Sequence, residues 1–317
     1  MMGIKKIKEN KMQITRFYKS FFSLIIVLLV LSCAERRAKK SYQMAEELLK
    51  NGNYKEAVVK YTEVLKYDKP IHEVEDAYYK IGMIYLKYLD DPNSAVYYFE
   101  QMFNKFPKSS RLPEAKRDIA YTYLYKLNQP EKALVNLEFI EKNYPRINFL
   151  DEVVYYKVKS LVALKKYEDA YKTLENFSTA FPQSKFVEEM EYQKAFVIFN
   201  QGKYKEAIEL YKNYLNKNPN SSFRAFAKFD TGVALENLGN YKEALETFKS
   251  IGSEYPNQEA LKIKIQKLEE RLKKKGKTPI TRTPKEIKKA RERTKSTSQK
   301  TKKTPKRSTK KHRESEN

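Results

Sequence analysis

A chain of 317 residues with 41% hydrophobic side chains can build a large buried core, which excludes disorder of the whole chain. Its formal net charge is +24, but the excess lies at the two ends. Residues 1–19 hold six basic side chains against one acidic, and residues 271–317 hold twenty against four. The body between the two ends is nearly neutral, so the high net charge does not indicate that the body binds nucleic acid.

The N-terminal basic run leads into an apolar stretch, Phe21–Leu31, that is too short to span a bilayer, which takes about 20 residues. This is the layout of a secretory signal peptide, and it predicts a signal over residues 1–32. The stretch runs into Val30-Leu31-Ser32-Cys33, which resembles the lipobox of bacterial lipoproteins, in which a small residue precedes the lipid-bearing cysteine.

The resemblance implies acylation of Cys33, with chains such as palmitate, and a short lipidated linker over residues 33–37. Ala34 after the cysteine favours sorting to the outer membrane. The alternative is an incidental or buried cysteine after an uncleaved segment. Because Cys33 is the only cysteine, no intramolecular disulfide can form, and packing alone must hold the fold.

Prolines recur every 37 or 38 residues through the body of the chain, which indicates an internal repeat. They are Pro70, Pro107, Pro145, Pro182, Pro219 and Pro256. Apolar residues at helical spacing precede each proline, and proline ends a helix because it lacks an N–H. Each repeat is therefore predicted to contain two helices.

Small residues in the first helix of each repeat predict that another helix crosses close by. The prediction is strongest at Gly82 and Gly232, because glycine inside a helix costs about 1 kcal/mol relative to alanine and a close crossing would explain it. Ser109, Ser184 and Ser221 follow their prolines by two residues and are predicted to cap the next helix. The sequences around Pro92 and Pro130 predict that the second and third repeats have turns one residue longer.

This pattern resembles the tetratricopeptide repeat, a helix-turn-helix unit that stacks into a superhelix. The last repeat has the family's signature residues in order: Gly232, Leu235, Gly239, Tyr241, Ala244, Phe248 and Pro256. The longer unit is similar to repeats of bacterial envelope proteins, namely the BamD lipoproteins of the outer-membrane β-barrel assembly machinery and the periplasmic CpoB proteins.

The expected fold is an all-α tetratricopeptide-repeat solenoid. Six repeats occupy residues 38–257, a capping helix occupies residues 258–274, and a disordered basic tail occupies residues 275–317. The cap is needed because the last repeat would otherwise expose its packing face. The tail has too few apolar residues to offset the entropy of ordering.

Residues with catalytic chemistry are sparse, since the chain has only two histidines and no phosphate-binding loop, nucleophile elbow or metal-ligand spacing. We expect no enzyme activity, no cofactor and no metal. The expected function is protein binding through a groove, because the resemblance implies that one first-helix position faces the concave side.

That position forms a mostly aromatic stripe, which Phe196 and Phe199 extend by helical spacing. Its members are Tyr42, Tyr79, Arg117, Tyr155, Tyr192 and Phe229. Aromatic side chains lose little rotamer entropy on binding and often dominate peptide recognition. The alternative interpretation is packing between neighbouring helices, and one residue can do both.

The basic tail is predicted to bind polyanions such as anionic lipid or glycan. Nucleic acid is disfavoured as the ligand, because an exported protein does not meet it. The alternative is that the tail is solvated and binds no ligand. The residues predicted to bind there are Lys273, Lys274, Lys275, Lys288, Lys289, Lys302, Lys303, Lys306, Arg307, Lys310 and Lys311.

The favoured function is a membrane-tethered scaffold that faces the periplasm and binds envelope or outer-membrane proteins, in its sharpest form with a BamD-like role in β-barrel assembly. One alternative function is a CpoB-like coordinator of the cell envelope, which would have the same membrane topology as the scaffold and would bind a different partner. A soluble repeat protein that binds nucleic acid through its tail is the alternative from another class.

Overall fold

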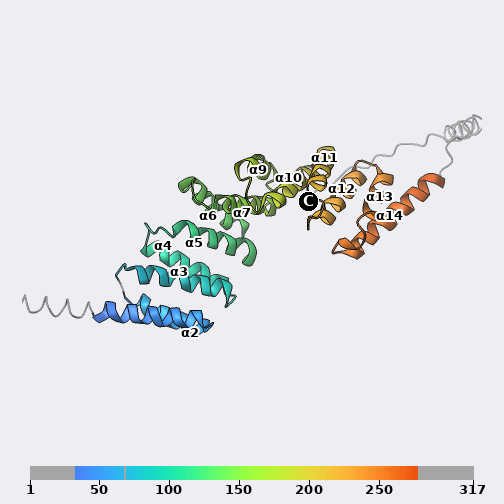
Figure 1. Ribbon diagram of the computed structural model, residues 1–317. Helices are drawn as coiled ribbons and strands as arrows, with labels where there is room; N and C mark the ends of the chain where they lie inside the picture. Colours follow the sequence, from blue (N-terminus) through green and yellow to red (C-terminus); the bar gives the residue numbers. More distant parts are fainter. Residues whose placement is uncertain (1–32, 68, 278–317) are drawn as a thin grey trace, which may run out of the picture. The chain divides into compact units, whose positions relative to one another are not determined.

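The computed structural model describes residues 33–67 and 69–277, and all the regular secondary structure in these ranges is helical (Figure 1). The chain divides into two compact units, with the boundary between Ala227 and Lys228. The signal-peptide prediction and most of the predicted tail lie outside the described residues. The all-α tetratricopeptide-repeat solenoid predicted from the sequence is confirmed.

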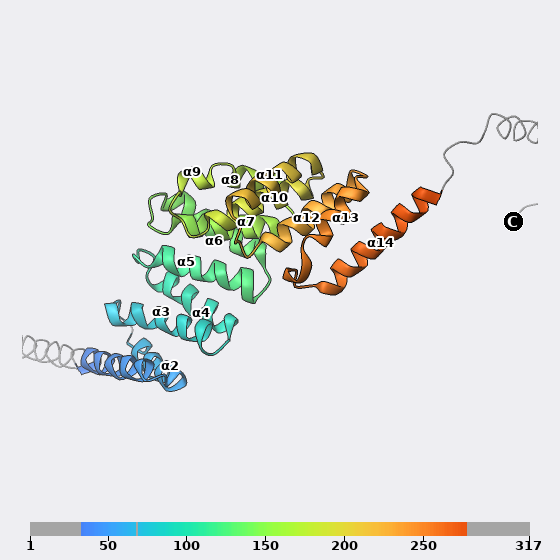
Figure 2. The ribbon, with the colours of Figure 1, turned by 45° about the vertical axis from the view of Figure 1, so that its right-hand side comes forward.

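In the first unit, antiparallel helix pairs follow one another, and Figure 2 shows them stacked side by side. The first helix of each pair, here called the A helix, is residues 33–50, α3 (His72–Lys87), α5 (Leu112–Tyr121), α7 (Leu150–Ala163) and α10 (Val187–Asn200). The B helices are α2 (Tyr54–Leu65), α4 (Pro92–Lys105), α6 (Pro130–Asn143), α8 (Tyr167–Leu174) with α9 (Phe177–Ala180), and α11 (Tyr204–Lys217).

The second unit contains the last repeat and the final helix. Its elements are α12 (Arg224–Asn237), which begins in the first unit, α13 (Tyr241–Lys249), the 3-10 helix η2 (Gly252–Glu254) and α14 (Gln258–Lys277). The predicted capping helix thus continues to residue 277. At the other end, residues 33–37 are helical, although the sequence suggested a linker there.

Turn length within a repeat follows the local sequence. In the first repeat, Asn53 N–H donates to the Leu48 carbonyl five residues earlier, at 2.9 Å. In the second, Asp91 N–H reaches back six residues to Tyr85 (3.1 Å), and in the third Gln129 N–H reaches Tyr123 (2.7 Å). In the third repeat the extra residue accompanies the π-helix η1 (Thr122–Lys126), which continues α5. The six-residue reach in both repeats confirms the longer turns predicted from the sequence.

The predicted close crossings are present inside repeats. A Cβ atom added to Gly82 on α3 would lie 2.7 Å from the ring of Phe99 on α4, and one added to Gly232 would lie 2.7 Å from Phe248. Each aromatic ring therefore occupies the space that glycine leaves open. This contact explains why two helices tolerate an interior glycine.

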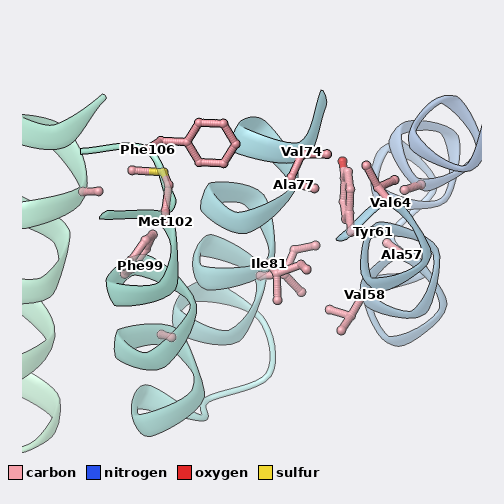
Figure 3. Packing of buried hydrophobic residues seen from close by; sticks show 14 of the residues in the cluster. Ala57, Val58, Tyr61, Val64, Val74, Ala77, Ile81, Phe99, Met102 and Phe106 are labelled. Atoms are coloured by element: carbon pink, nitrogen blue, oxygen red, sulfur yellow. The ribbon is translucent and has the colours of Figure 1, made fainter. Parts of the chain in front are cut away.

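The core runs through the interfaces of successive helices. Figure 3 shows Tyr61 of α2 and Ile81 of α3 on facing helices, with Phe99 and Met102 of α4 packed on the other side of α3. All four side chains are fully buried, and burial of a side chain of this size contributes about 1.5–3 kcal/mol. Every repeat thus depends on its neighbours for its core.

Three serines at the junctions between repeats bind both the helix that follows and an earlier A helix. Their hydroxyls donate to carboxylates in the preceding A helix: Ser109 to Glu75 (2.5 Å), Ser184 to Asp151 (2.6 Å) and Ser221 to Glu188 (2.5 Å). The same oxygens accept from the backbone N–H of Arg111, Phe186 and Phe223, each the residue just before a helix. The serines thus precede the N-cap position that we predicted for them, because they close a turn over two residues.

Candidate functional site

The stripe predicted from the sequence forms hydrogen bonds between successive A helices. Tyr79 Oη donates to Asp118 Oδ2 at 2.9 Å, and Tyr155 Oη donates to Glu189 Oε2 at 3.1 Å. Arg117 Nη1 lies 3.4 Å from Glu152 Oε2, and Tyr42 Oη donates to Asp76. Each donor therefore binds a carboxylate on the next A helix, and these bonds fix how neighbouring repeats pack.

The remaining stripe residues make ring contacts. Tyr192 is buried and stacks on Phe223, with ring centroids 5.1 Å apart, while Phe196 and Phe199 are half-buried in the same cluster. Phe229, in the second unit, stacks on Tyr255 at 4.3 Å. The stripe thus makes extensive packing contacts, and ligand contact by it stays a prediction.

One turn beyond the stripe, three consecutive A helices of the first unit enclose a pocket of about 450 Å³, which we call the A-face pocket. It is lined by Met83, Leu86 and Lys87 of α3, Arg117, Asp118 and Tyr121 of α5, Lys126 of η1, and Glu152 and Tyr156 of α7. Of the predicted stripe residues, only Arg117 lines it. The pocket therefore combines rings, cations and carboxylates on one surface.

The pocket floor is an ion pair held by neighbouring helices. Arg117 Nη2 lies 2.9 Å from Asp118 Oδ1, and the guanidinium also lies over the ring of Phe149 at 4.7 Å. Burial raises the pKa of Asp118, while Arg117 and the Tyr79 hydroxyl act in the opposite direction. Because Arg117 donates to Asp118 and Glu152 inside the fold, its guanidinium is half-buried in a fixed orientation at the floor, with its charge offset by these carboxylates.

Tyrosines form the wall of the pocket. The ring of Tyr121 lies 5.1 Å from Tyr125 and 5.8 Å from Tyr156, and Tyr156 lies 5.3 Å from Tyr155. Burial and the nearby Glu152 raise the pKa of Tyr156, so its phenol stays protonated and donates to that carboxylate at 3.0 Å. Tyr125 is 43% exposed, which leaves an accessible aromatic edge beside the pocket.

Two lysines stand at the pocket's rim. Lys87 and Lys126 are both exposed, and Lys126 pairs with Asp90 at 2.8 Å across the open turn. Rings flanked by cations suit a peptide that presents apolar and acidic side chains together. Among residues 33–67 and 69–277, no group of three histidine, cysteine or acidic side chains is placed to hold a metal ion.

The structure places the other predicted site residues away from the pocket. Cys33 is exposed at the beginning of the first described helix. Lys273 and Lys274 are exposed on α14, and Lys275 belongs to the same helix. The rest of the predicted polyanion-binding residues lie outside the described ranges, from Lys288 and Lys289 to Lys310 and Lys311. Within the described part, no helix is long and apolar enough to cross a membrane.

Sequence reasoning missed most of the pocket, although a signal for it existed. Met83 and Tyr121 each follow a stripe residue by four positions, which places them one helical turn further along the same face. The stripe position was predicted because the resemblance to tetratricopeptide repeats implies that it faces the concave side. The side chains of the stripe point between neighbouring A helices, and residues one helical turn further along line the open surface.

Comparison with known proteins agrees with this architecture. The profile of an outer membrane lipoprotein family, the one that includes BamD, matches residues 152–276, and a tetratricopeptide-repeat profile matches residues 76–109. No curated protein sequence matches the chain.

Among solved structures, a tetratricopeptide-repeat protein from Parabacteroides merdae aligns with a TM-score of 0.56 at 13% identity, covering 76% of this chain and 89% of its own. PilW, described as a widely conserved type IV pilus biogenesis factor, aligns with a TM-score of 0.50 at 19% identity. The alignment covers 73% of this chain and 97% of PilW. At these identities the likeness concerns the fold.

The helix pairs and the shared core define the class: the chain is an all-α tetratricopeptide-repeat solenoid, a fold found in protein-binding scaffolds. More particularly, it resembles the BamD family of outer membrane lipoproteins, with the matched segment at residues 152–276.

Proposed function

We propose that this chain is a lipid-anchored scaffold of the bacterial envelope that binds segments of envelope proteins in the A-face pocket. The observation that supports binding there is the convergence of three A helices on one open surface with two tyrosine rings and a half-buried arginine. Aromatic and arginine side chains in partly desolvated positions are the residues that most often dominate protein interfaces.

Anchoring rests on Cys33. It is exposed, it follows the lipobox-like sequence, and the resemblance of residues 152–276 is to lipoproteins. Two or more acyl chains hold a protein stably at a bilayer. We propose that the solenoid faces the periplasm from the outer membrane, where outer-membrane β-barrel precursors are the partner class that the family resemblance favours.

The test compares envelope proteins captured by wild type and by Tyr121→Ala/Tyr156→Ala from detergent extracts of the native host. We expect the double variant to lose its main partner or to bind it about 30-fold more weakly, the scale of an interface hot spot. Tyr97→Ala is the matched control, since Tyr97 is 55% exposed on the B helix α4. Unchanged capture by a folded double variant would contradict binding in the pocket.

The anchor is tested separately by intact mass. Protein purified from host membranes is expected to begin at an acylated Cys33, and Cys33→Ala is expected to keep its N-terminal segment and leave the detergent phase. A wild-type mass that begins at Met1 without lipid would contradict the tether.

A further inference from the structure

The first A helix has two faces of different character. Ala38, Ser41 and Ala45 point into the first repeat and are 4%, 7% and 0% exposed. On the other side, Cys33, Arg36, Arg37, Lys40 and Met44 are all exposed, and their spacing of three and four residues places them on one face of the helix. The residue proposed to carry lipid therefore shares a face with three cations.

These cations are available to a ligand. No described residue forms an ion pair with Arg36, Arg37 or Lys40, whereas the neighbouring Lys39 pairs with Glu35 at 2.7 Å. Lys66 at the end of α2 is exposed and lines a hollow together with Arg37 and Glu63, and Lys69 is exposed three residues further on. Between Cys33 and Met44 this face thus carries three cations and no carboxylate, and the exposed Glu47 follows one turn later.

We propose that this face, Cys33, Arg36, Arg37, Lys40 and Met44, docks on anionic phospholipid headgroups, so that the first A helix lies along the membrane surface. The proposal deepens the proposed function, because it rests on a tether at Cys33. From Cys33 to Met44 the helix rises about 16 Å, so the face lies within reach of the headgroups around its own lipid.

Charge and position favour this occupant. A lysine or arginine near an anionic leaflet strengthens association about fivefold, and three together about a hundredfold. Met44, 41% exposed, gives the same face an apolar side chain at the depth where headgroups meet acyl chains. A second copy of the chain would bring the same three cations against one another, and the predicted tail is also basic, so both would be repelled.

The chain has no tryptophan, so Met44→Trp introduces a single fluorescent reporter on the face, and Val135→Trp introduces one on α6, where Val135 is 67% exposed. Full-length protein is mixed with phosphatidylcholine vesicles that contain about 30% phosphatidylglycerol, or none, with brominated acyl chains as quenchers. We expect quenching and a blue shift for Met44→Trp on anionic vesicles only, and no change for Val135→Trp.

In the Met44→Trp background, Arg36→Gln/Arg37→Gln/Lys40→Gln is expected to abolish the quenching, as is about 0.5 M NaCl. Lys108→Gln/Lys142→Gln/Lys165→Gln, at exposed lysines elsewhere in the first unit, is the control and is expected to retain it. Because the reporter is local, vesicle binding by the C-terminal lysines does not produce the signal.

Intact mass of the same samples separates the two proposals. If Cys33 carries no lipid but the Met44→Trp signal is present and sensitive to the three cations, the tether fails and the docking face stands. If the reporter stays unquenched on anionic vesicles, or is quenched equally in the triple variant, the docking face is wrong whatever the mass of Cys33.

Discussion

Tyr79 on α3 and Asp118 on α5 join two successive repeats, because the tyrosine hydroxyl donates a 2.9 Å hydrogen bond to a carboxylate that is almost fully enclosed. Removing the donor leaves that carboxylate with Arg117 as its remaining side-chain partner. Asp118 also forms part of the floor of the A-face pocket, so this hydrogen bond helps to orient the floor.

The first prediction concerns this pair. Tyr79→Phe should lower the free energy of unfolding by about 1.5–3 kcal/mol, since a hydrogen bond to a buried charged group is lost. Urea unfolding followed by circular dichroism measures it. Tyr97→Phe, at an exposed hydroxyl, should change stability by less than about 0.5 kcal/mol. Equal effects of the two substitutions would show that the Tyr79 bond adds nothing specific.

The second prediction concerns the crossing of α3 and α4. Gly82→Ala should destabilise the chain by about 1–3 kcal/mol despite its better helix propensity, because the new methyl would lie 2.7 Å from Phe99. Gly82→Ala/Phe99→Leu should recover part of the loss, since a smaller side chain makes room. Thermal melts of the two single variants and the double variant measure the coupling, and simple additivity would contradict the contact.

The third prediction uses the backbone of the turn after α7. Lys165 adopts a φ of +57°, a left-handed conformation that glycine adopts at the matching positions Gly52, Gly202 and Gly239. Lys165→Gly should stabilise the chain by roughly 1 kcal/mol, because the strain of a side chain in this region disappears. Lys172→Gly, at an exposed position inside the helix α8, should destabilise it by about 1 kcal/mol. Denaturation midpoints distinguish the two cases.

The fourth prediction is a pH dependence at the start of α4. Hydrogen bonds from Ser94 hold the pKa of Asp91 below its usual 3.8, with the Ser94 N–H at 3.1 Å capping the helix. Because the folded pKa is lowered, the stabilisation is present above pH 3.8 and is lost as the pH falls through the folded value.

At neutral pH, Asp91→Ala should therefore cost about 1 kcal/mol, and the difference from wild type should shrink in acid. Asp91→Asn retains a capping oxygen and does not titrate, so its advantage over Asp91→Ala should not vary with pH. Melting temperatures at pH 7 and near pH 3 provide the comparison. A wild-type advantage over Asp91→Ala that is the same at both pH values would contradict a titrating cap.

Features that depend on local sequence were predicted well. Proline spacing determined the repeat, the sequences at Pro92 and Pro130 predicted the longer turns, and Gly82 indicated a crossing that the Phe99 ring fills. Each of these depends on residues close in sequence or on the repeat period itself.

The pocket could not be derived in the same way. Whether a side chain one turn along an A helix is exposed or covered depends on the next repeat, 37 or 38 residues away. Arg117 shows the difficulty: it interrupts an aromatic stripe in the sequence, yet it is the stripe residue that reaches the pocket. Its partners Asp118 and Glu152 gave no signal, since acidic residues on a helical repeat usually face solvent.

The serine contacts also make the junctions unequal. The junctions after α4, α9 and α11 each have a serine bound to a carboxylate. After α6, Ile147 occupies that place and packs against the buried cluster that contains Leu137 and Val153. Apolar contacts weaken on cooling. Two of the helices that line the A-face pocket, α5 and α7, flank this junction, so we expect cooling to change their spacing more than the spacing of helices at the serine junctions.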